Sequence, residues 1–280
     1  MRVITYNVQS PDLPSSPLQP VINDRCAHVL GVILAALSDA PAMPTFVCLQ
    51  EVCTTWVARF STALAQYGYA YVMHKYSSGT WPPLFCMIFY PIHTFRVVPS
   101  PVVPTGAVCD HEHITRFGLT QEDVIYNALR RNSVFGGIFT SIASPTTQFV
   151  VATYHAPCLY ARHPRAQQLH IANALRYLTQ FPNLPVVLAG DFNMTPEDAA
   201  YLQHVRGPDC IDAMATLTNG HHVATNSCPR FTGCLDYSFS NRLAVPTQQT
   251  LSGFLASPYL SDMQPSDHAL LQTFYTLKSL

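Results

Sequence analysis

Charged side chains are scarce in this chain of 280 residues. Asp, Glu, Lys and Arg together make up 11% of the sequence, against roughly 25% in ordinary soluble domains. Apolar residues make up 48%, a composition that excludes a disordered chain. The formal net charge of −1 also excludes a basic surface that binds nucleic acid or anionic membranes non-specifically.

Long apolar runs and repeated cysteine motifs are also absent. The longest apolar run covers residues 29–37, whereas a membrane-spanning helix needs about 20 residues, and the N-terminus lacks the apolar core of a signal peptide. The nine cysteines are an odd number without a repeated CxxC, which predicts buried, reduced thiols. We therefore expect a soluble, intracellular protein of the cytoplasm or nucleus. Nothing in the sequence indicates a membrane span or an obligate protein partner.

Short strands and helices are predicted in clusters along the chain. Apolar runs bounded by polar residues or proline predict strands at 2–8, 45–50, 69–76, 84–90, 93–99, 133–142, 147–155, 185–190, 234–240 and 268–277. Helical spacing predicts helices at 21–38, 52–66, 161–181 and 195–205. The segment 101–132 is the least readable, and its polar run TQEDVIYNALRR at 120–131 is a candidate helix.

Several of these strands are spaced as hairpins. Such spacing favours a two-sheet α/β sandwich with helices packed outside over the competing doubly wound parallel sheet. No linker divides the chain convincingly, so we predict one domain over residues 1–280.

Polar residues are placed where the predicted strands end. They are Asn7, Glu51, His155, Asp191, Asn193, Asp267 and His268, with Asp236 inside an apolar strand. An unpaired buried carboxylate costs roughly several kcal/mol, so these positions need an explanation. One economical explanation is a hard divalent cation, because Mg²⁺ binds oxygen ligands that include one or two carboxylates. Glu51 and Asp267 are the candidate carboxylate ligands, with Asn7 nearby.

The stretch VVLAGDFNMTPED at 186–198 carries two of these polar residues. Strand alternation predicts that Asp191 and Asn193 share one face, with Phe192 in the core and Gly190 allowing close approach. The alternative is a strand-to-helix turn in which Asp or Asn only caps the following helix. That helix is predicted to begin near Thr195, with proline in its first turn.

Six short motifs occur in order over almost the whole chain: TYNV at 5–8, CLQEV at 48–52, TYHAP at 153–157, AGDFNMTP at 189–196, LDYSF at 235–239 and PSDHALL at 265–271. Together they resemble the motifs of the endonuclease/exonuclease/phosphatase superfamily, which includes deoxyribonuclease I. The resemblance implies a four-layered α/β/β/α sandwich of two mostly antiparallel sheets with helices outside. It also implies metal-dependent hydrolysis of a phosphoester at one edge of the sheets.

The resemblance implies metal and water-activating roles for five residues. Glu51 would be the principal Mg²⁺ ligand, with Asn7 and Asp267 nearby, and Mn²⁺ would be a substitute. Asp191 would orient or deprotonate the attacking water. Asn193 would hold a phosphate oxygen or that water.

Two histidines also match the family pattern. His268, oriented by Asp236, would stabilise charge on the phosphoryl oxygens. His155 falls where many members have a histidine in an HL motif, although Ala156 follows it here. Donors of this kind stabilise the transition state by roughly 3 to 4 kcal/mol each, by analogy with oxyanion holes.

The charge balance bears on the substrate. Few lysines and no basic run favour a short, single-stranded, terminal or small-molecule phosphoester over a long duplex. We expect a deadenylase-like or tyrosyl-DNA phosphodiesterase-like enzyme acting on a nucleic acid end or single strand. A phosphoinositide phosphatase or a sphingomyelinase-type hydrolase remains open, as does a non-catalytic protein that uses the cleft for binding.

Two further clusters have less clear roles. Cys109, His111 and His113 in the CDHEH segment are zinc-type ligands, but no second ligand pair follows at a familiar spacing, so we assign no metal there. Arg165 and Gln167 open the helix after His155. They either contact phosphate groups or lie on a wet helix face.

Overall fold

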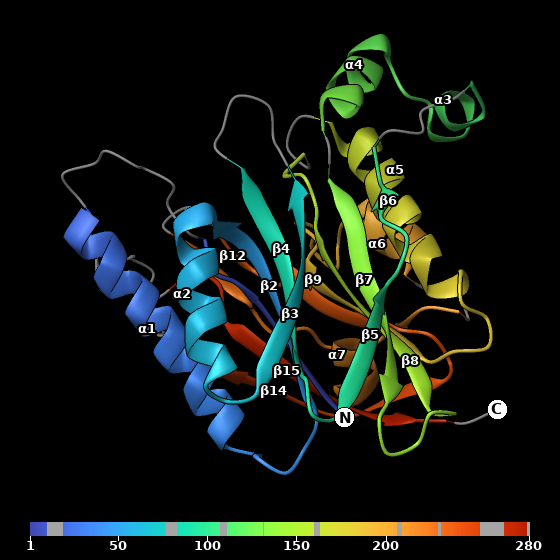
Figure 1. Ribbon diagram of the computed structural model, residues 1–280. Helices are drawn as coiled ribbons and strands as arrows, with labels where there is room; N and C mark the ends of the chain where they lie inside the picture. Colours follow the sequence, from blue (N-terminus) through green and yellow to red (C-terminus); the bar gives the residue numbers. More distant parts are fainter. Residues whose placement is uncertain are drawn as a thin grey trace.

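Two β-sheets lie against each other in the centre of the molecule, and helices cover their outer faces (Figure 1). The computed structural model describes residues 1–9, 19–76, 83–106, 111–130, 132–159, 163–205, 209–228, 231–252 and 266–278. The predicted α/β/β/α sandwich is confirmed.

The first sheet has six strands: β1 (Arg2–Asn7), β2 (Thr45–Cys53), β3 (Tyr69–Tyr76), β4 (Leu84–Pro91), β14 (Ala244–Ser252) and β15 (Leu270–Leu277). Their order is β14-β15-β1-β2-β4-β3, and of the described pairs only β1–β2 is parallel. Helices α1 (Gln19–Ser38) and α2 (Thr54–Ala65) pack on its outer face (Figure 1).

The second sheet is built from β5 (Phe95–Pro99), β6 (Val103–Pro104), β7 (Ser133–Ser141), β8 (Gln148–His155), β9 (Val186–Asp191), β10 (Ile211–Asp212) and β13 (Asp236–Ser240). The order is β10-β13-β9-β8-β7-β5, and β6 pairs with β7. Its one parallel pair among the described strands is β8–β9. Both sheets are therefore mostly antiparallel.

Helices and a small ribbon complete the second half of the molecule. They are α3 (His111–Phe117), α4 (Gln121–Leu129), α5 (Pro164–Leu175), the 3₁₀ turn Arg176–Thr179, α6 (Ala199–His204), α7 (Ala213–Leu217), β11 (Asn226–Cys228) and β12 (Phe231–Gly233). Residues of α5 and α6 pack on the outer face of the second sheet, and α3 and α4 contact α5 (Figure 1).

An aromatic core joins the two sheets. Phe46 of the first sheet lies 4.7 Å from Phe139 and 5.5 Å from Phe149 of the second, measured between ring centroids. All three rings are buried, and burial of rings this large is the main favourable term in folding. The core holds the two sheets in a fixed position relative to each other.

A buried polar contact joins the sheets nearer the site. Gln50 of β2 donates its side-chain amide to the hydroxyl of Thr153 on β8 at 2.8 Å and accepts a hydrogen bond from Thr5 on β1 at 3.3 Å. The parallel pairs β1–β2 and β8–β9 each bring two carboxyl ends to the same edge. Four strand ends therefore meet at one rim of the sandwich.

Several element boundaries differ from the prediction. Residues 195–198 form a turn, in which the Thr195 amide donates to Asp198 Oδ2 at 2.7 Å, and the helix begins only at Ala199. Strand β14 and the short β10, β11 and β12 were not predicted. The unclear segment contains β6, α3 and α4. Cys109 lies outside the described residues, and the histidines of CDHEH begin α3.

Within the described residues, the structure contains no helix with the length and apolar character needed to cross a membrane.

Gly190 of β9 is required for the close approach of two strands. A Cβ at this position would lie 1.9 Å from the carbonyl oxygen of Tyr154 on β8. We expect Gly190→Ala to lower the free energy of unfolding by about 3 kcal/mol or more, because backbone must move to relieve the overlap. Gly31→Ala in α1 is the matched control, since its Cβ meets nothing within 4 Å, and it should stabilise by up to about 1 kcal/mol. Equal urea midpoints for the two variants would contradict this account.

His170 of α5 links the helix layer to the second sheet. It is fully buried, and its Nδ1 lies 2.8 Å from the hydroxyl of Thr105. Burial, helped by the nearby charge of Arg130, lowers the pKa of His170 to about 3. In the unfolded chain, His170 binds a proton as the pH falls below about 6.5, whereas in the folded protein it stays neutral. The free energy of unfolding therefore decreases as the pH drops below that value.

We expect this linkage to cost about 2 kcal/mol at pH 5. His170→Asn retains an amide near the Nδ1 position and does not titrate, so its unfolding free energy should depend less on pH between 7 and 5. Denaturant titrations of both proteins across this range measure the difference. Parallel pH profiles would show that His170 is not the group responsible.

Candidate active site

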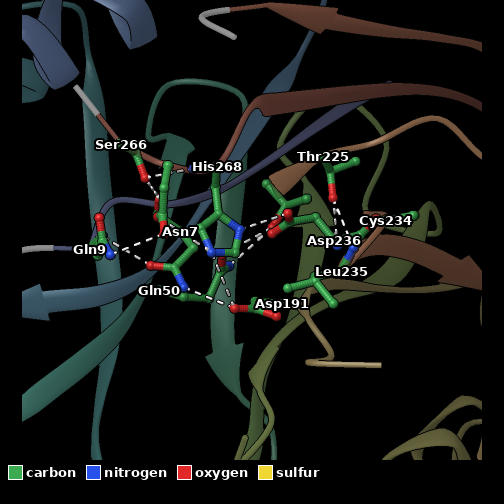
Figure 2. A network of polar contacts seen from close by, with 12 residues as sticks. Asn7, Gln9, Gln50, Asp191, Thr225, Cys234, Leu235, Asp236, Ser266 and His268 are labelled. Atoms are coloured by element: carbon green, nitrogen blue, oxygen red, sulfur yellow. Dashed lines mark hydrogen bonds and ion pairs between the residues drawn. The ribbon is translucent and has the colours of Figure 1, made fainter. Parts of the chain in front are cut away.

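The predicted polar residues meet at the rim where the four strands end. Figure 2 labels four of them: Asn7, Asp191, Asp236 and His268. Asn7, at the end of β1, donates its side-chain amide to Glu51 Oε1 and to Asp191 Oδ2, both at 2.9 Å. Glu51 belongs to the first sheet and Asp191 to the second. One buried amide therefore holds a carboxylate from each sheet.

Glu51 is presented by a bulge within β2. The register of β2 with β4 shifts between Leu49 and Val52, and Glu51 has a φ of 56°. For a residue other than glycine this left-handed conformation costs free energy, and such residues are enriched at functional sites. The strand was predicted to stop before Glu51, but it continues through the bulge to Cys53.

Asp191 and Asn193 lie together, but not through strand alternation as predicted. Strand β9 ends at Asp191, and Asn193 has a φ of 46°. Asp191 Oδ1 accepts the Asn193 backbone amide at 2.8 Å, and the Asn193 side chain donates to the Ala156 carbonyl at 2.9 Å. Gln167 donates to the Asn193 carbonyl. A turn closed by Asp191 therefore places Asn193, while Phe192 is buried in the core as predicted.

Asp236 contacts His268 in the buried part of the site. Asp236 Oδ2 lies 2.8 Å from His268 Nδ1, and Nε2 lies 3.7 Å from Asp191 Oδ2 (Figure 2). Nε2 also lies 3.7 Å from Asp267 Oδ1. Burial disfavours the imidazolium, but Asp236, Asp191 and Asp267 outweigh it and raise the pKa of His268 to about 10. His268 therefore carries a positive charge at neutral pH in this arrangement.

His155 faces the site from the end of β8. Its Nε2 lies 3.3 Å from Glu51 Oε1 and 3.7 Å from Asp191 Oδ2. Its Nδ1 lies 2.5 Å from the hydroxyl of Tyr76, at the end of β3. Burial raises the pKa of Tyr76 well above its ordinary value, so this phenol is neutral at physiological pH.

Asp267 has one oxygen that accepts a hydrogen bond and one that faces His268 Nε2 at 3.7 Å without accepting one. Gln9 donates to Asp267 Oδ2 at 3.1 Å, and Arg25 of α1 donates to Gln9 at 2.9 Å. Oδ1 is buried and accepts no hydrogen bond from the described residues. Burial, with the negative charges of Glu51 and Asp191, raises the pKa of Asp267. A buried acceptor oxygen that receives no hydrogen bond is what a cation would use.

The donor set fits a metal ion. Two groups of side chains each place one polar atom per residue within 4.8 Å of one another: Glu51 with His155 and Asp191, and Asp191 with Asp236 and His268. The carboxylate oxygens of these groups are the candidate ligands, because Nδ1 of each histidine already faces a hydrogen-bond partner. Carboxylate and amide oxygens dominate the rim, and a hard cation prefers such ligands. Together with the Asp267 oxygen that accepts no hydrogen bond from the described residues, this arrangement supports a metal site.

The sequence reasoning missed Gln9 and Arg25, and it did not predict the contacts that Tyr76 and Gln167 make. Four residues contact the site from outside the six motifs: Tyr76, Gln9, Arg25 and Gln167. Most of these contacts join segments that are distant in the chain, so a local sequence pattern does not reveal them. Gln167 had been placed on a helix that either contacts phosphate or faces water; it is instead buried. Arg165 donates to the Gly118 carbonyl at 2.5 Å.

Comparison with solved structures shows the same fold in other proteins. An endonuclease/exonuclease/phosphatase from Bacteroides vulgatus superposes with a TM-score of 0.72 at 17% identity, covering 99% of this chain and 98% of that one. TDP2 of D. rerio complexed with single strand DNA product gives 0.67 at 15% identity, covering 99% and 98%. ANGEL2, a 2′,3′-cyclic phosphatase in complex with adenosine-2′,3′-vanadate, gives 0.69 at 17% identity, covering 99% and 95%.

A comparison with curated proteins found no match. The sequence does match the Endonuclease/Exonuclease/phosphatase family over residues 4–268, nearly its whole length. This match agrees with the order of the motifs, the two-sheet sandwich and the acidic rim. The chain therefore belongs to the Endonuclease/Exonuclease/phosphatase family of hydrolases.

Proposed function

We propose that the protein is a Mg²⁺-dependent phosphoester hydrolase that acts on a nucleic acid end or single strand, with Mn²⁺ as a substitute ion. The observation that carries the proposal is the Asn7 side chain, which holds Glu51 and Asp191 at 2.9 Å each while His268, fixed by Asp236, faces Asp191. Groups suited to bind a metal ion, to activate water and to contact phosphate therefore lie at one rim.

Glu51 and Asp267 would hold the cation, with Asn7 beside them. Asn7 fixes the position of Glu51, and Oδ1 of Asp267 accepts no hydrogen bond from the described residues. The bound cation supplies a Lewis acid for a non-bridging phosphoryl oxygen. Gln9 limits the rotation of Asp267 by holding its other oxygen.

Asp191 is the proposed acceptor of the proton from the attacking water. It is buried, and burial raises its pKa despite the nearby histidines and the Asn7 hydrogen bond. A carboxylate with a raised pKa is a better proton acceptor at neutral pH. The Asn193 amide bonded to Asp191 Oδ1 leaves Oδ2 facing the site.

His268 and Asn193 are the proposed donors to the phosphoryl oxygens. The His268 imidazolium presents Nε2 toward Asp191 and Asp267, so its charge lies next to the reacting group. Asn193 uses one amide proton for the Ala156 carbonyl and retains a second. Preorganised donors of this type stabilise developing negative charge without needing to reorient during the reaction.

Two structural relatives support a nucleic acid substrate. TDP2 holds a single strand DNA product, and ANGEL2 holds an adenosine vanadate. The net charge of −1 on this chain also suits a terminal or single-stranded substrate better than a long duplex. Hydrolysis of a phosphoinositide or of sphingomyelin would instead favour the corresponding phosphatase or sphingomyelinase-type alternative. A ligand that is bound but not hydrolysed would favour the non-catalytic alternative.

Activity should require both the metal and Asp191. We expect hydrolysis of at least one member of a panel of poly(A) RNA, 5′-tyrosyl DNA, abasic DNA, an inositol phosphate and sphingomyelin, with Mg²⁺ and not with EDTA. Asp191→Asn should lower kcat by about 10²–10⁴-fold, because it removes the proton acceptor. Asp209→Asn, an exposed carboxylate paired with Arg242, is the control. Binding without hydrolysis across the panel would favour the non-catalytic alternative.

The metal should also stabilise the fold. In EDTA, Asp267→Asn should melt at or above the wild-type temperature, because it removes one of several crowded negative charges. Added Mg²⁺ should raise the melting temperature of the wild type. At a concentration 100 times its Kd, the ion should add about 2.7 kcal/mol to the free energy of unfolding.

The Asp267→Asn variant should gain much less from Mg²⁺, whereas Asp209→Asn should gain as much as the wild type. Differential scanning calorimetry with a Mg²⁺ titration measures each effect. A full Mg²⁺ response in Asp267→Asn would remove Asp267 from the ligand set.

A further inference from the structure

Tyr76 makes a short contact with a histidine of the site and has no role in the proposed function described so far. Its hydroxyl lies 2.5 Å from His155 Nδ1, and the two rings meet edge to face with centroids 5.3 Å apart. Tyr76 ends β3 of the first sheet, whereas His155 ends β8 of the second. This contact therefore also crosses between the sheets.

The surroundings of the phenol determine which way its proton points. The backbone amide of Glu51, in the β2 bulge, donates to the phenolic oxygen. A phenol is protonated at neutral pH, since its ordinary pKa is about 10. In the part of the chain that the structure describes, His155 Nδ1 is the acceptor that lies within reach of that proton. The Tyr76 hydroxyl thus donates to Nδ1, which must be unprotonated.

The other face of the imidazole leads to the same assignment. Nε2 faces two carboxylate oxygens, Glu51 Oε1 at 3.3 Å and Asp191 Oδ2 at 3.7 Å. An unprotonated Nε2 would direct its lone pair at these oxygens, whereas an Nε2–H group is attracted to them. Both faces of the ring therefore favour a proton on Nε2 and none on Nδ1.

We propose that Tyr76 is a positioning residue that holds His155 as the neutral Nε2–H tautomer, so that His155 serves as a hydrogen-bond donor to the phosphoryl group. The inference rests on the proposed hydrolase function for its consequence, but the tautomer itself is a property of the free protein. With Nδ1 occupied by the phenol, His155 has no free nitrogen lone pair in the site. It is therefore not the base that activates water.

The arrangement contrasts with that of the second histidine. His268 Nδ1 faces the carboxylate of Asp236, which can only accept, so its Nδ1 carries a proton. His155 Nδ1 faces the Tyr76 hydroxyl, which can donate its proton to the ring nitrogen. Asp236 accepts a hydrogen bond from His268, whereas Tyr76 donates one to His155. The two histidines therefore differ in whether Nδ1 carries a proton.

Nitrogen NMR of protein labelled with ¹⁵N-histidine tests the tautomer without any substrate. The His155 signals are assigned by their loss in His155→Gln. We expect Nδ1 in the range of unprotonated imidazole nitrogens and Nε2 in the protonated range. In Tyr76→Phe, which keeps the ring and removes only the hydroxyl, both signals should move toward averaged positions as the tautomers mix. Tyr71→Phe, on the exposed part of the same strand, is the matched control and should give the wild-type spectrum.

Kinetics on the panel substrate that the enzyme hydrolyses tests the consequence. Tyr76→Phe should lower kcat by about 10–100-fold with little change in KM, as expected for loss of a group that orients a functional histidine. Tyr71→Phe should retain wild-type kcat and KM. Unchanged His155 signals in Tyr76→Phe, or two protonated nitrogens in the wild type, would overturn the proposal while leaving the hydrolase function intact. Absence of hydrolysis with the expected spectra would instead reject the hydrolase function and its consequence for His155.

Discussion

Crowding of carboxylates at one rim is the constraint that the surrounding structure must satisfy. Glu51, Asp191, Asp236 and Asp267 converge there from both sheets. Each is held by a donor: Asn7 bridges the first two, His268 binds Asp236, and Gln9 binds Asp267. These donors are mainly neutral amides, which reduce the repulsion without removing the negative charge. The rim therefore keeps an affinity for a cation at a cost in stability, as is common at functional sites.

The fold provides the rigidity that such a rim needs. Each sheet has one parallel pair at its centre, so four strands end at the same edge. Gln50 fastens the two sheets to each other beneath the site, and Gly190 lets β8 and β9 approach closely. Buried groups in these positions have little freedom to move. The relative position of Asn7 and Asp191 therefore follows from the packing of two sheets rather than from either sheet alone.

Much of this arrangement follows from local sequence pattern, and the remainder depends on tertiary contacts. The strand ends and their polar residues could be predicted, because a carboxylate after a buried apolar run has few alternatives. The conformations of Glu51 and Asn193 could not, since both have positive φ values imposed by a bulge and a turn. Tyr76 could not be distinguished from the core aromatics that commonly end strands, because its partner His155 is 79 positions away in the chain.

The two histidines together limit where the proton of an attacking water can go. His268 bears a proton on Nδ1 toward Asp236, and the surrounding carboxylates raise its pKa to about 10, which favours a second proton on Nε2 in the free protein. His155, held by Tyr76, also presents an N–H to the rim. Neither imidazole has a lone pair for water, so the carboxylates are the acceptors that remain. Among them Asp191 is buried between both rings, and its raised pKa suits it to receive a proton. Under the proposed function, the two histidines would donate hydrogen bonds and Asp191 would accept the proton of the water.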